Sequence, residues 1–336
     1  MRYVPVVLAL LVPSLATASP TPTLTLTKIT HGDADVPTGF FTRDGKTFYV
    51  KLGGQLLRGA PGGDGTTTNV KTDANPDWVV PLGVSPDGTK AAYGELNHIV
   101  MLDLTTGATT RQQAWNAGST HNIEWLTSTK LLATTSGDWD SAVAITDLEA
   151  KASQMICTKL KVKSSMDAWA APDGKHLAVV ADGNLVWTDV ACKSVKKQPG
   201  WKGWVKRVAI SPGGKWIAAN VDGGAGIGGR VQVGKVGSAP KLVVTGKGRM
   251  SGEPFWLSND LLLFTDGGPF EPSETDQGQG LMLYAVKTGA IQKVTLPEKC
   301  EAYVLAVPAG GGHALLEVTC AGKRTIGILS APAASR

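Results

Sequence analysis

Acidic side chains in glycine-rich segments are the residues of this chain whose types and spacing could do chemistry. Asp138 and Asp140 flank Trp139, Arg230 ends a segment with five glycines, and a third segment spans residues 266–280. The acidic residues of this third segment are Asp266, Glu271, Glu274 and Asp276. Clustered carboxylates are ligands that a hard cation such as calcium prefers. Asp-Xaa-Asp at 138–140 matches no calcium loop, and Asp-Gly pairs are also ordinary hairpin turns. We therefore expect no cofactor and keep calcium as the alternative.

The histidines and serines give little support to catalysis. The five histidines occupy different positions along the chain: His31, His98, His121, His176 and His313. The chain contains neither Gly-Xaa-Ser-Xaa-Gly nor His-Glu-Xaa-Xaa-His, the motifs of serine-hydrolase elbows and zinc peptidases. We therefore expect a binding protein rather than an enzyme.

A repeated unit must position these residues. Seven times an apolar strand runs into a tight polar turn and returns as a second apolar strand, about every 44 residues. The turns lie at residues 43–46, 85–88, 127–130, 171–175, 211–215, 257–260 and 309–312. This period, with four short strands per unit, is typical of β-propeller blades. We predict an all-β fold, a seven-bladed β-propeller of four-stranded antiparallel blades. A six-bladed ring, with the first unit as something else, is the alternative.

The second and fourth units show the four strands, a to d, most clearly. We expect strands at 80–85, 90–93, 98–104 and 109–113, and again at 168–171, 176–181, 185–189 and 195–198. Strand a is the innermost in a propeller.

The turns Ser-Pro-Asp-Gly-Thr-Lys at 85–90 and Ala-Pro-Asp-Gly-Lys at 171–175 resemble the WD-like repeat of TolB-type β-propellers, a bacterial periplasmic group. The resemblance covers most of residues 38–330 and implies a periplasmic binding propeller. The chain departs from TolB itself, because it has seven units and no room for TolB's additional N-terminal domain.

The last unit lacks a fourth strand of its own. After strands at 302–307, 314–320 and 325–329, only a short tail of small residues remains. Residues 23–29 form a strand without a blade. We predict that this N-terminal strand closes the last blade and removes two exposed sheet edges.

Four cysteines predict two disulfides in an exported chain. Cys300 and Cys320 flank the last hairpin symmetrically about residue 310, so they face each other across two antiparallel strands. Cys157 and Cys192 then pair by elimination and connect the third unit to the fourth. Zinc ligands would be spaced more closely.

The N-terminus and the charge distribution bear on location and partners. Residues 1–18 have Arg2, an apolar stretch and a small-residue site at 16–18, which is typical of a secretory signal peptide. We expect a single domain at 19–336, no transmembrane segment after cleavage, and a periplasmic or secreted monomer.

The formal charge is +5, and the excess gathers between residues 159 and 207. A solvated basic face is one interpretation, and an anionic partner such as lipopolysaccharide or an acidic protein is the other. Export disfavours nucleic acid.

The positions of the loops in a propeller predict one binding face. The b–c and d–a loops share one end of the blades, and the a–b and c–d turns share the other. Five of the ten tryptophans fall in or beside b–c and d–a loops: Trp78, Trp115, Trp139, Trp201 and Trp204. Exposed tryptophans contribute large contact area at low entropy cost. We therefore predict binding of a protein or envelope partner through this loop face, although these tryptophans could also fold inward and cap the ring. A metal-dependent, lactonase-like hydrolase with Glu253, Asp138 or Asp266 near the central channel is the alternative.

Overall fold

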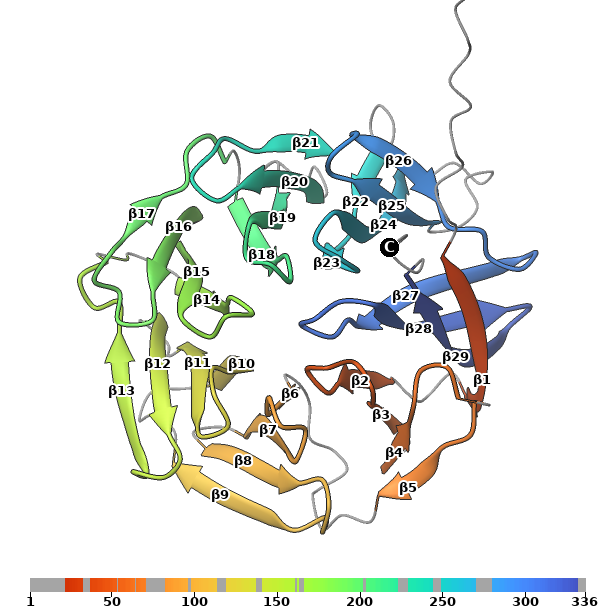
Figure 1. Cartoon of the computed structure of the whole chain (residues 1–336), viewed down its shortest axis with the longest axis horizontal. Helices are drawn as coiled ribbons and strands as arrows, with labels where there is room; N and C mark the ends of the chain where they lie inside the picture. Colours follow the sequence, from red (N-terminus) through yellow and green to blue (C-terminus); the bar gives the residue numbers. More distant parts are fainter. Residues whose placement is uncertain are drawn as a thin grey trace, which may run out of the picture.

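The structure is a computed structural model in which seven antiparallel sheets form a ring (Figure 1). It describes residues 22–32, 37–52, 54–63, 65–70, 82–95, 98–113, 119–136, 141–160, 162, 166–201, 204–222, 229–243, 249–269 and 280–331. These residues form strands, turns and bends, with no helix among them. The prediction of a seven-bladed β-propeller is confirmed.

The first four blades each contain four strands, in chain order from the centre outward. Blade 1 contains β2 (Thr38–Phe41), β3 (Phe48–Leu52), β4 (Gln55–Gly59) and β5 (Thr68–Val70). Blade 2 contains β6 (Leu82–Val84), β7 (Lys90–Glu95), β8 (His98–Asp103) and β9 (Thr109–Gln113). Blade 3 contains β10 (Ser119–Trp125), β11 (Lys130–Ser136), β12 (Ser141–Asp147) and β13 (Ala152–Ile156). Blade 4 contains β14 (Met166–Ala170), β15 (His176–Ala181), β16 (Asn184–Asp189) and β17 (Lys196–Lys197).

Blade 5 follows the same plan, with β18 (Trp204–Ile210), β19 (Trp216–Asp222), β20 (Gly229–Lys235) and β21 (Lys241–Val243). Blades 6 and 7 each depart from it in one strand. Blade 6 contains β22 (Arg249–Ser251), β23 (Phe255–Trp256), β24 (Leu261–Pro269), β25 (Gly280–Ala285) and β26 (Ala290–Lys293). Blade 7 contains β27 (Cys300–Ala306), β28 (His313–Cys320) and β29 (Lys323–Ser330), together with β1 (Thr23–His31).

Side chains in the a–b turns fix the ends of the inner hairpins. In blade 2 the Ser85 hydroxyl donates to Asp87 and accepts from the backbone N–H of Lys90 at 2.9 Å. Gly88, at a φ of 73°, donates its N–H to the Ser85 carbonyl. Thr42 and Asp44 repeat the hydroxyl–carboxylate contact in blade 1. Such local bonds explain why the turn residues recur with the blade period.

In each of blades 2, 3 and 4, one aspartate accepts hydrogen bonds that hold the c–d turn. The carboxylate of Asp103 accepts the backbone N–H groups of Thr105 and Thr106, both at 2.8 Å. Asp147 accepts those of the second and third residues that follow it, and Asp189 repeats the contact with Ala191. Hydrogen bonds from Ser194 and nearby backbone N–H groups lower the pKa of Asp189 to about 2. The repeated Xaa-Asp-Xaa ending of strand c is therefore a turn signal.

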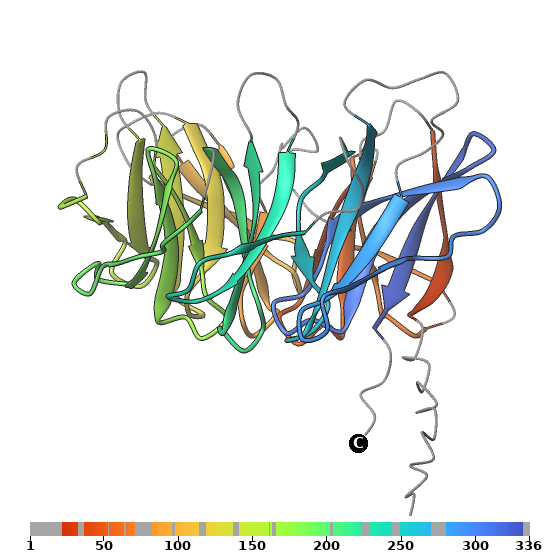
Figure 2. The same ribbon diagram turned by 90° about the horizontal axis from the view of Figure 1, so that it is seen from above.

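The N-terminal strand closes the ring as predicted. Strand β1 pairs antiparallel with β29, from Thr23 opposite Ser330 to His31 opposite Arg324, and completes the sheet of blade 7. The two strands lie side by side at the rim in both views (Figures 1 and 2). The Thr27 hydroxyl also donates to the Ile326 carbonyl at 2.8 Å.

Both predicted disulfides are present. Cys300 and Cys320 are direct partners in the β27–β28 ladder, with Cα atoms 4.2 Å apart. Cys157 and Cys192 have Cα atoms 5.0 Å apart and link blade 3 to blade 4. Disulfides are typical of oxidising compartments. Residues 1–18 lie outside the described residues, so the signal peptide stays a prediction.

The hydrophobic core lies between neighbouring blades. One cluster joins Ala178 and Val180 of blade 4 to Val205, Val208 and Ile217 of blade 5, all buried. Every sheet is thus covered on both faces by its neighbours, as a propeller requires. In the described residues, no helix has the length and apolar character needed to cross a membrane.

Candidate functional site

Four of the predicted binding-face residues can be placed in the structure. These are Trp201, Trp204, Arg230 and Asp266. The other eight lie outside the described residues: Trp78, Trp115, Asp138, Trp139, Asp140, Glu271, Glu274 and Asp276. Because consecutive strands of each sheet are antiparallel, the d–a and b–c connections lie at the same end of the blades, as the sequence analysis expected.

Trp204 is the most exposed of the large apolar side chains described. It begins β18, and 48% of the residue is accessible. Its ring covers the b–c turn of blade 4: a Cβ added to Gly183, which has a φ of 75°, would lie 3.1 Å from Trp204 Cε3. Trp201 instead packs partly buried against the blade 4–blade 5 core, and its Nε1 finds no acceptor among the described residues. The Trp204 ring is therefore exposed to solvent and accessible to a partner, whereas Trp201 mainly packs against the core between blades 4 and 5.

Asp266 and Arg230 are strand residues rather than loop residues. Asp266 pairs with Gly280 in the β24–β25 ladder and is only 7% exposed, which corrects its expected place in an exposed acidic loop. The reason is that strand β24 continues through the Asp-Gly pair to Pro269, where it pairs with β22. Arg230 is exposed and stands opposite Val221 in the β19–β20 ladder.

The basic residues between 159 and 207 do not form one face. Lys196 and Lys197 form the outer strand β17, whereas Lys206 and Arg207 line the central channel. Lys161, Lys163 and Lys202 lie outside the described residues. Propeller geometry places neighbouring sequence segments at the rim and at the axis, so a charge cluster in sequence is divided in space.

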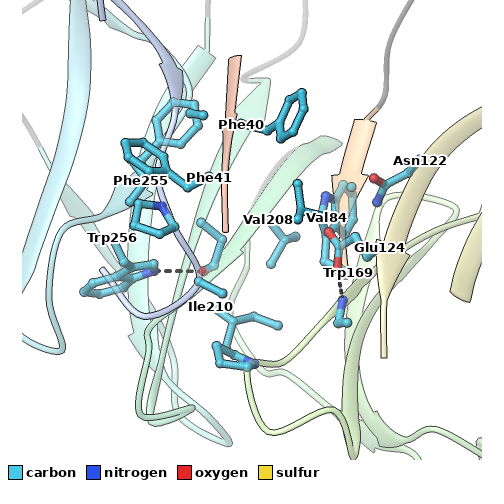
Figure 3. A pocket seen from close by; sticks show the side chains of 18 of the residues that line it. Phe40, Phe41, Val84, Asn122, Glu124, Trp169, Val208, Ile210, Phe255 and Trp256 are labelled. Atoms are coloured by element: carbon cyan, nitrogen blue, oxygen red, sulfur yellow. Dashed lines mark hydrogen bonds between the residues drawn. The ribbon is translucent and has the colours of Figure 1, made fainter. Parts of the chain in front are cut away.

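A cavity of about 620 Å³ occupies the channel and is lined by strand-a segments from all seven blades (Figure 3). Its charged and amide-bearing residues, apart from Arg43, come from blades 3 to 6: Asn122, Glu124, Asp167, Lys206, Arg207 and Glu253. Glu253 therefore lies near the channel, as the hydrolase alternative expected. Asp266 is not among the lining residues.

Polar side chains of β10 bind the neighbouring innermost strand. Asn122 Nδ2 donates to the Ala168 carbonyl at 2.8 Å, and the Glu124 carboxylate accepts the Ala170 N–H (Figure 3). These backbone groups face the channel at the inner edge of β14, where no further strand pairs. The side chains thus satisfy backbone groups that would otherwise be costly to bury.

The electrostatics of the channel centre on Glu124. Desolvation raises its pKa from 4.5 to about 7, with a contribution from the Asp167 charge. Hydrogen bonds from Ala170 and Asn122 and the Arg207 charge oppose the rise. Arg207 pairs with Glu253 and lies over the Phe255 ring, 5.1 Å from its centroid.

The broken innermost strand of blade 6 places Glu253 in the channel. Strands β22 and β23 are separated at residues 252–254, where Pro254 lacks an N–H for the ladder. Gly252 keeps one bond to the Thr265 carbonyl at 2.6 Å. Among the described residues, no group of three or more His, Cys, Asp or Glu could hold a metal ion.

The sequence reasoning missed Asn122, Glu124 and Asp167, and it grouped Arg207 with the basic residues between 159 and 207. The signal was available: Asn122 and Glu124 alternate with buried Ile123 and Trp125 in β10. Asn122 and Glu124 point away from the core shared with blade 2 and toward β14 of blade 4, as their bonds to Ala168 and Ala170 show.

Comparison with known proteins supports the fold. The chain is similar to the β-propeller domain of Cps50 (Swd1) from Myceliophteria thermophila, with a TM-score of 0.60 and 11% sequence identity over 91% of this chain and 99% of that one. At this identity the likeness shows the fold alone. No family model and no curated protein matches the sequence. The resemblance to TolB-type propellers therefore stays a prediction.

Proposed function

We propose that this protein is an exported, non-catalytic β-propeller of the TolB type that binds a protein or envelope partner through its b–c and d–a loop face. The observation that carries the proposal is Trp204. A rigid aromatic ring, 48% exposed and supported from below by the Gly183 turn, is preorganised for contact. A propeller scaffold suits this role because its loops stand on a rigid ring. The two disulfides suit export to the periplasm or beyond.

Replacement of Trp204 tests the proposal. A partner captured from envelope extracts by the intact protein should bind the Trp204→Ala variant at least about tenfold more weakly, because central aromatic anchors contribute most of an interface's affinity. Leu242→Ala is the matched control, since Leu242 is 46% exposed on β21 at the rim of the same blade. Its affinity should match that of the wild type. Equal binding by both variants would show that the partner docks elsewhere.

A metal-dependent hydrolase in the channel is the alternative function. Glu253 lines the cavity, which favours it, but the carboxylate already pairs with Arg207. If the protein still binds its partner after a chelator has removed divalent metal ions, the result supports the binding function. Stoichiometric calcium or zinc, lost from the purified protein together with a hydrolytic activity, would favour the enzyme instead.

A further inference from the structure

The Trp204 ring lies against a tight turn of the neighbouring blade. Only Asp182 and Gly183 connect β15 to β16, and their φ angles of 47° and 75° are typical of a type I′ hairpin turn. A Cβ added to Gly183 would lie 3.1 Å from Trp204 Cε3, 3.5 Å from Cδ2 and 3.6 Å from Cζ3. Because the two ring atoms beside Cε3 are hardly farther away than Cε3 itself, the turn lies over a face of the ring rather than at its edge. The exposed part of the residue, 48%, therefore lies mainly on the opposite face and the ring edges.

An ion pair lies beside this ring. Trp204 stands directly opposite Asp222 in the β18–β19 ladder, so the two side chains are neighbours on one face of the sheet. Lys206 Nζ lies 2.9 Å from Asp222 Oδ2, and the two side chains are 56% and 27% exposed. Lys206 also lines the channel, so the pair lies between the ring and the channel. Accessible charged groups thus adjoin the aromatic ring.

Both members of the ion pair can form hydrogen bonds beyond their contact with each other. A lysine ammonium has three N–H donors, and a carboxylate has about four acceptor positions. Each hydroxyl of a sugar both donates and accepts, and the oxygens of two adjacent hydroxyls lie at a separation similar to the 2.9 Å between Lys206 Nζ and Asp222 Oδ2. Two adjacent hydroxyls can therefore bond this pair without breaking it.

The surroundings of Trp204 favour a saccharide over a protein surface. The centre of a protein–protein interface is depleted of charged residues. The Trp204 ring, in contrast, lies beside an ion pair and on the polar turn that leads to the exposed Asn184. A pyranose ring has an apolar C–H face, similar in size to the six-membered ring of an indole, and hydroxyl groups around its perimeter. Its shape and polarity thus match an aromatic face bordered by charged groups.

We propose that the partner recognised at the loop face is a saccharide, in which one gluco-configured pyranose ring stacks on Trp204 and two adjacent hydroxyls bond Lys206 and Asp222. The hydroxyls of this configuration are equatorial, so the ring C–H groups form the two faces and can contact the indole. This inference rests on the proposed function, because it assigns a chemical class to the partner that Trp204 binds. The envelope component is then a glycan.

Isothermal titration calorimetry with cellotriose, a linear trisaccharide of glucose, tests the inference. Sorbitol is the control ligand, because it has the adjacent hydroxyls of reduced glucose but no ring face. Cellotriose should bind with a Kd of about 1 mM or less, and sorbitol should not bind at the same concentrations.

Variants of the site separate stacking from hydrogen bonding. Trp204→Ala should weaken cellotriose binding by at least about tenfold, whereas Trp204→Phe keeps an aromatic face and should lose less. Lys206→Met should weaken binding by about tenfold, because it removes a charged donor. Leu242→Ala is the matched control, since Leu242 is 46% exposed on the outer strand of the same blade, and it should bind cellotriose as the wild type does.

Three results would each overturn the inference. These are no cellotriose binding by the intact protein up to about 10 mM, equal affinity for sorbitol, and full cellotriose affinity in Trp204→Ala. If Trp204→Ala does not fold, the comparison with sorbitol and the Lys206→Met variant decide. Loss of the captured envelope partner in Trp204→Ala, without any cellotriose binding by the intact protein, would overturn only the saccharide and leave the loop-face proposal standing.

Discussion

The Glu124 carboxyl predicts a specific pH dependence of stability. Its pKa is raised from 4.5 to about 7 in the folded protein, so the folded state binds the proton more tightly than the unfolded state. The resulting stabilisation is fully present below about pH 4.5 and is lost as the pH rises through about 7. Glu124→Gln keeps an oxygen that can accept the Ala170 N–H but removes the ionisation. We expect urea unfolding to show about 1–3 kcal/mol greater stability than the wild type near pH 8 and nearly equal stability near pH 4.5.

The control for this prediction is Glu149→Gln, which makes the same chemical change at an exposed turn. Its unfolding free energy should follow that of the wild type at both pH values. A Glu124→Gln variant with an unchanged pH profile would mean that the carboxyl titrates normally in the channel.

Single residues could be predicted from the sequence where their role is local. Ser85 and Asp87 bond within their own turn, so their spacing is visible in the sequence. Cys300 and Cys320 could be paired because one hairpin relates them. Asn122, Glu124 and Asp167 were missed because alternation along one strand does not show which neighbouring strand their side chains meet. That neighbour becomes apparent only when the blades are placed side by side.

At the scale of elements, innermost strands of neighbouring blades are joined by side chains rather than by a ladder. Trp125 Nε1 donates to the Gly83 carbonyl of blade 2 at 2.9 Å, and Trp256 Nε1 donates to the Ala209 carbonyl of blade 5 at 3.0 Å. Both tryptophans are buried at the end of strand a. The repeated Trp-Leu pair before two of the a–b turns is the sequence signal for this contact.

Replacement of either tryptophan by phenylalanine should weaken a blade interface. Each variant loses one hydrogen bond to a partly buried carbonyl, which costs about 0.5–1.5 kcal/mol. Chemical denaturation measures the loss. Trp216→Phe is the control, because Trp216 begins β19 with its ring under Lys235. A loss in Trp125→Phe and Trp256→Phe no greater than in this control would contradict a role for the inter-blade bonds.

Most strands could be predicted from the period of the repeat and the residues of its turns, and the exceptions have physical causes. Strand β9 has the predicted bounds, and β15 does too. The break between β22 and β23 was not predicted, because the sixth unit was assigned to the same four-strand template as the others. Asp266 was placed at the start of the loop at 266–280, yet β24 continues through it to Pro269 and pairs it with Gly280. Pro254 thus interrupts a strand locally, whereas strand pairing extends β24 through Asp266.

At the scale of the whole molecule, one strand turns an open arc of blades into a ring. Strand β1 covers the edge of β29 and inserts Ile29, which is 6% exposed, into the core shared by blades 7 and 1. Removal of residues 22–31 would expose that edge together with Ile326 and Ile328 of the same core. The truncated chain should melt about 10 °C lower or more, since several kcal/mol of pairing and burial are lost. It should also self-associate through the free edge.

Complementation separates closure of the ring from a general effect of truncation. A synthetic peptide of residues 22–32 should restore the melting temperature of the truncated protein, because it can pair with β29 in the same register. The same peptide with Ile29→Asp should fail, because a carboxylate cannot enter the apolar site of Ile29 without a large desolvation cost. Differential scanning calorimetry with each peptide measures both effects. An unchanged melting temperature after truncation, or equal rescue by both peptides, would mean that the seven blades hold together without the N-terminal strand.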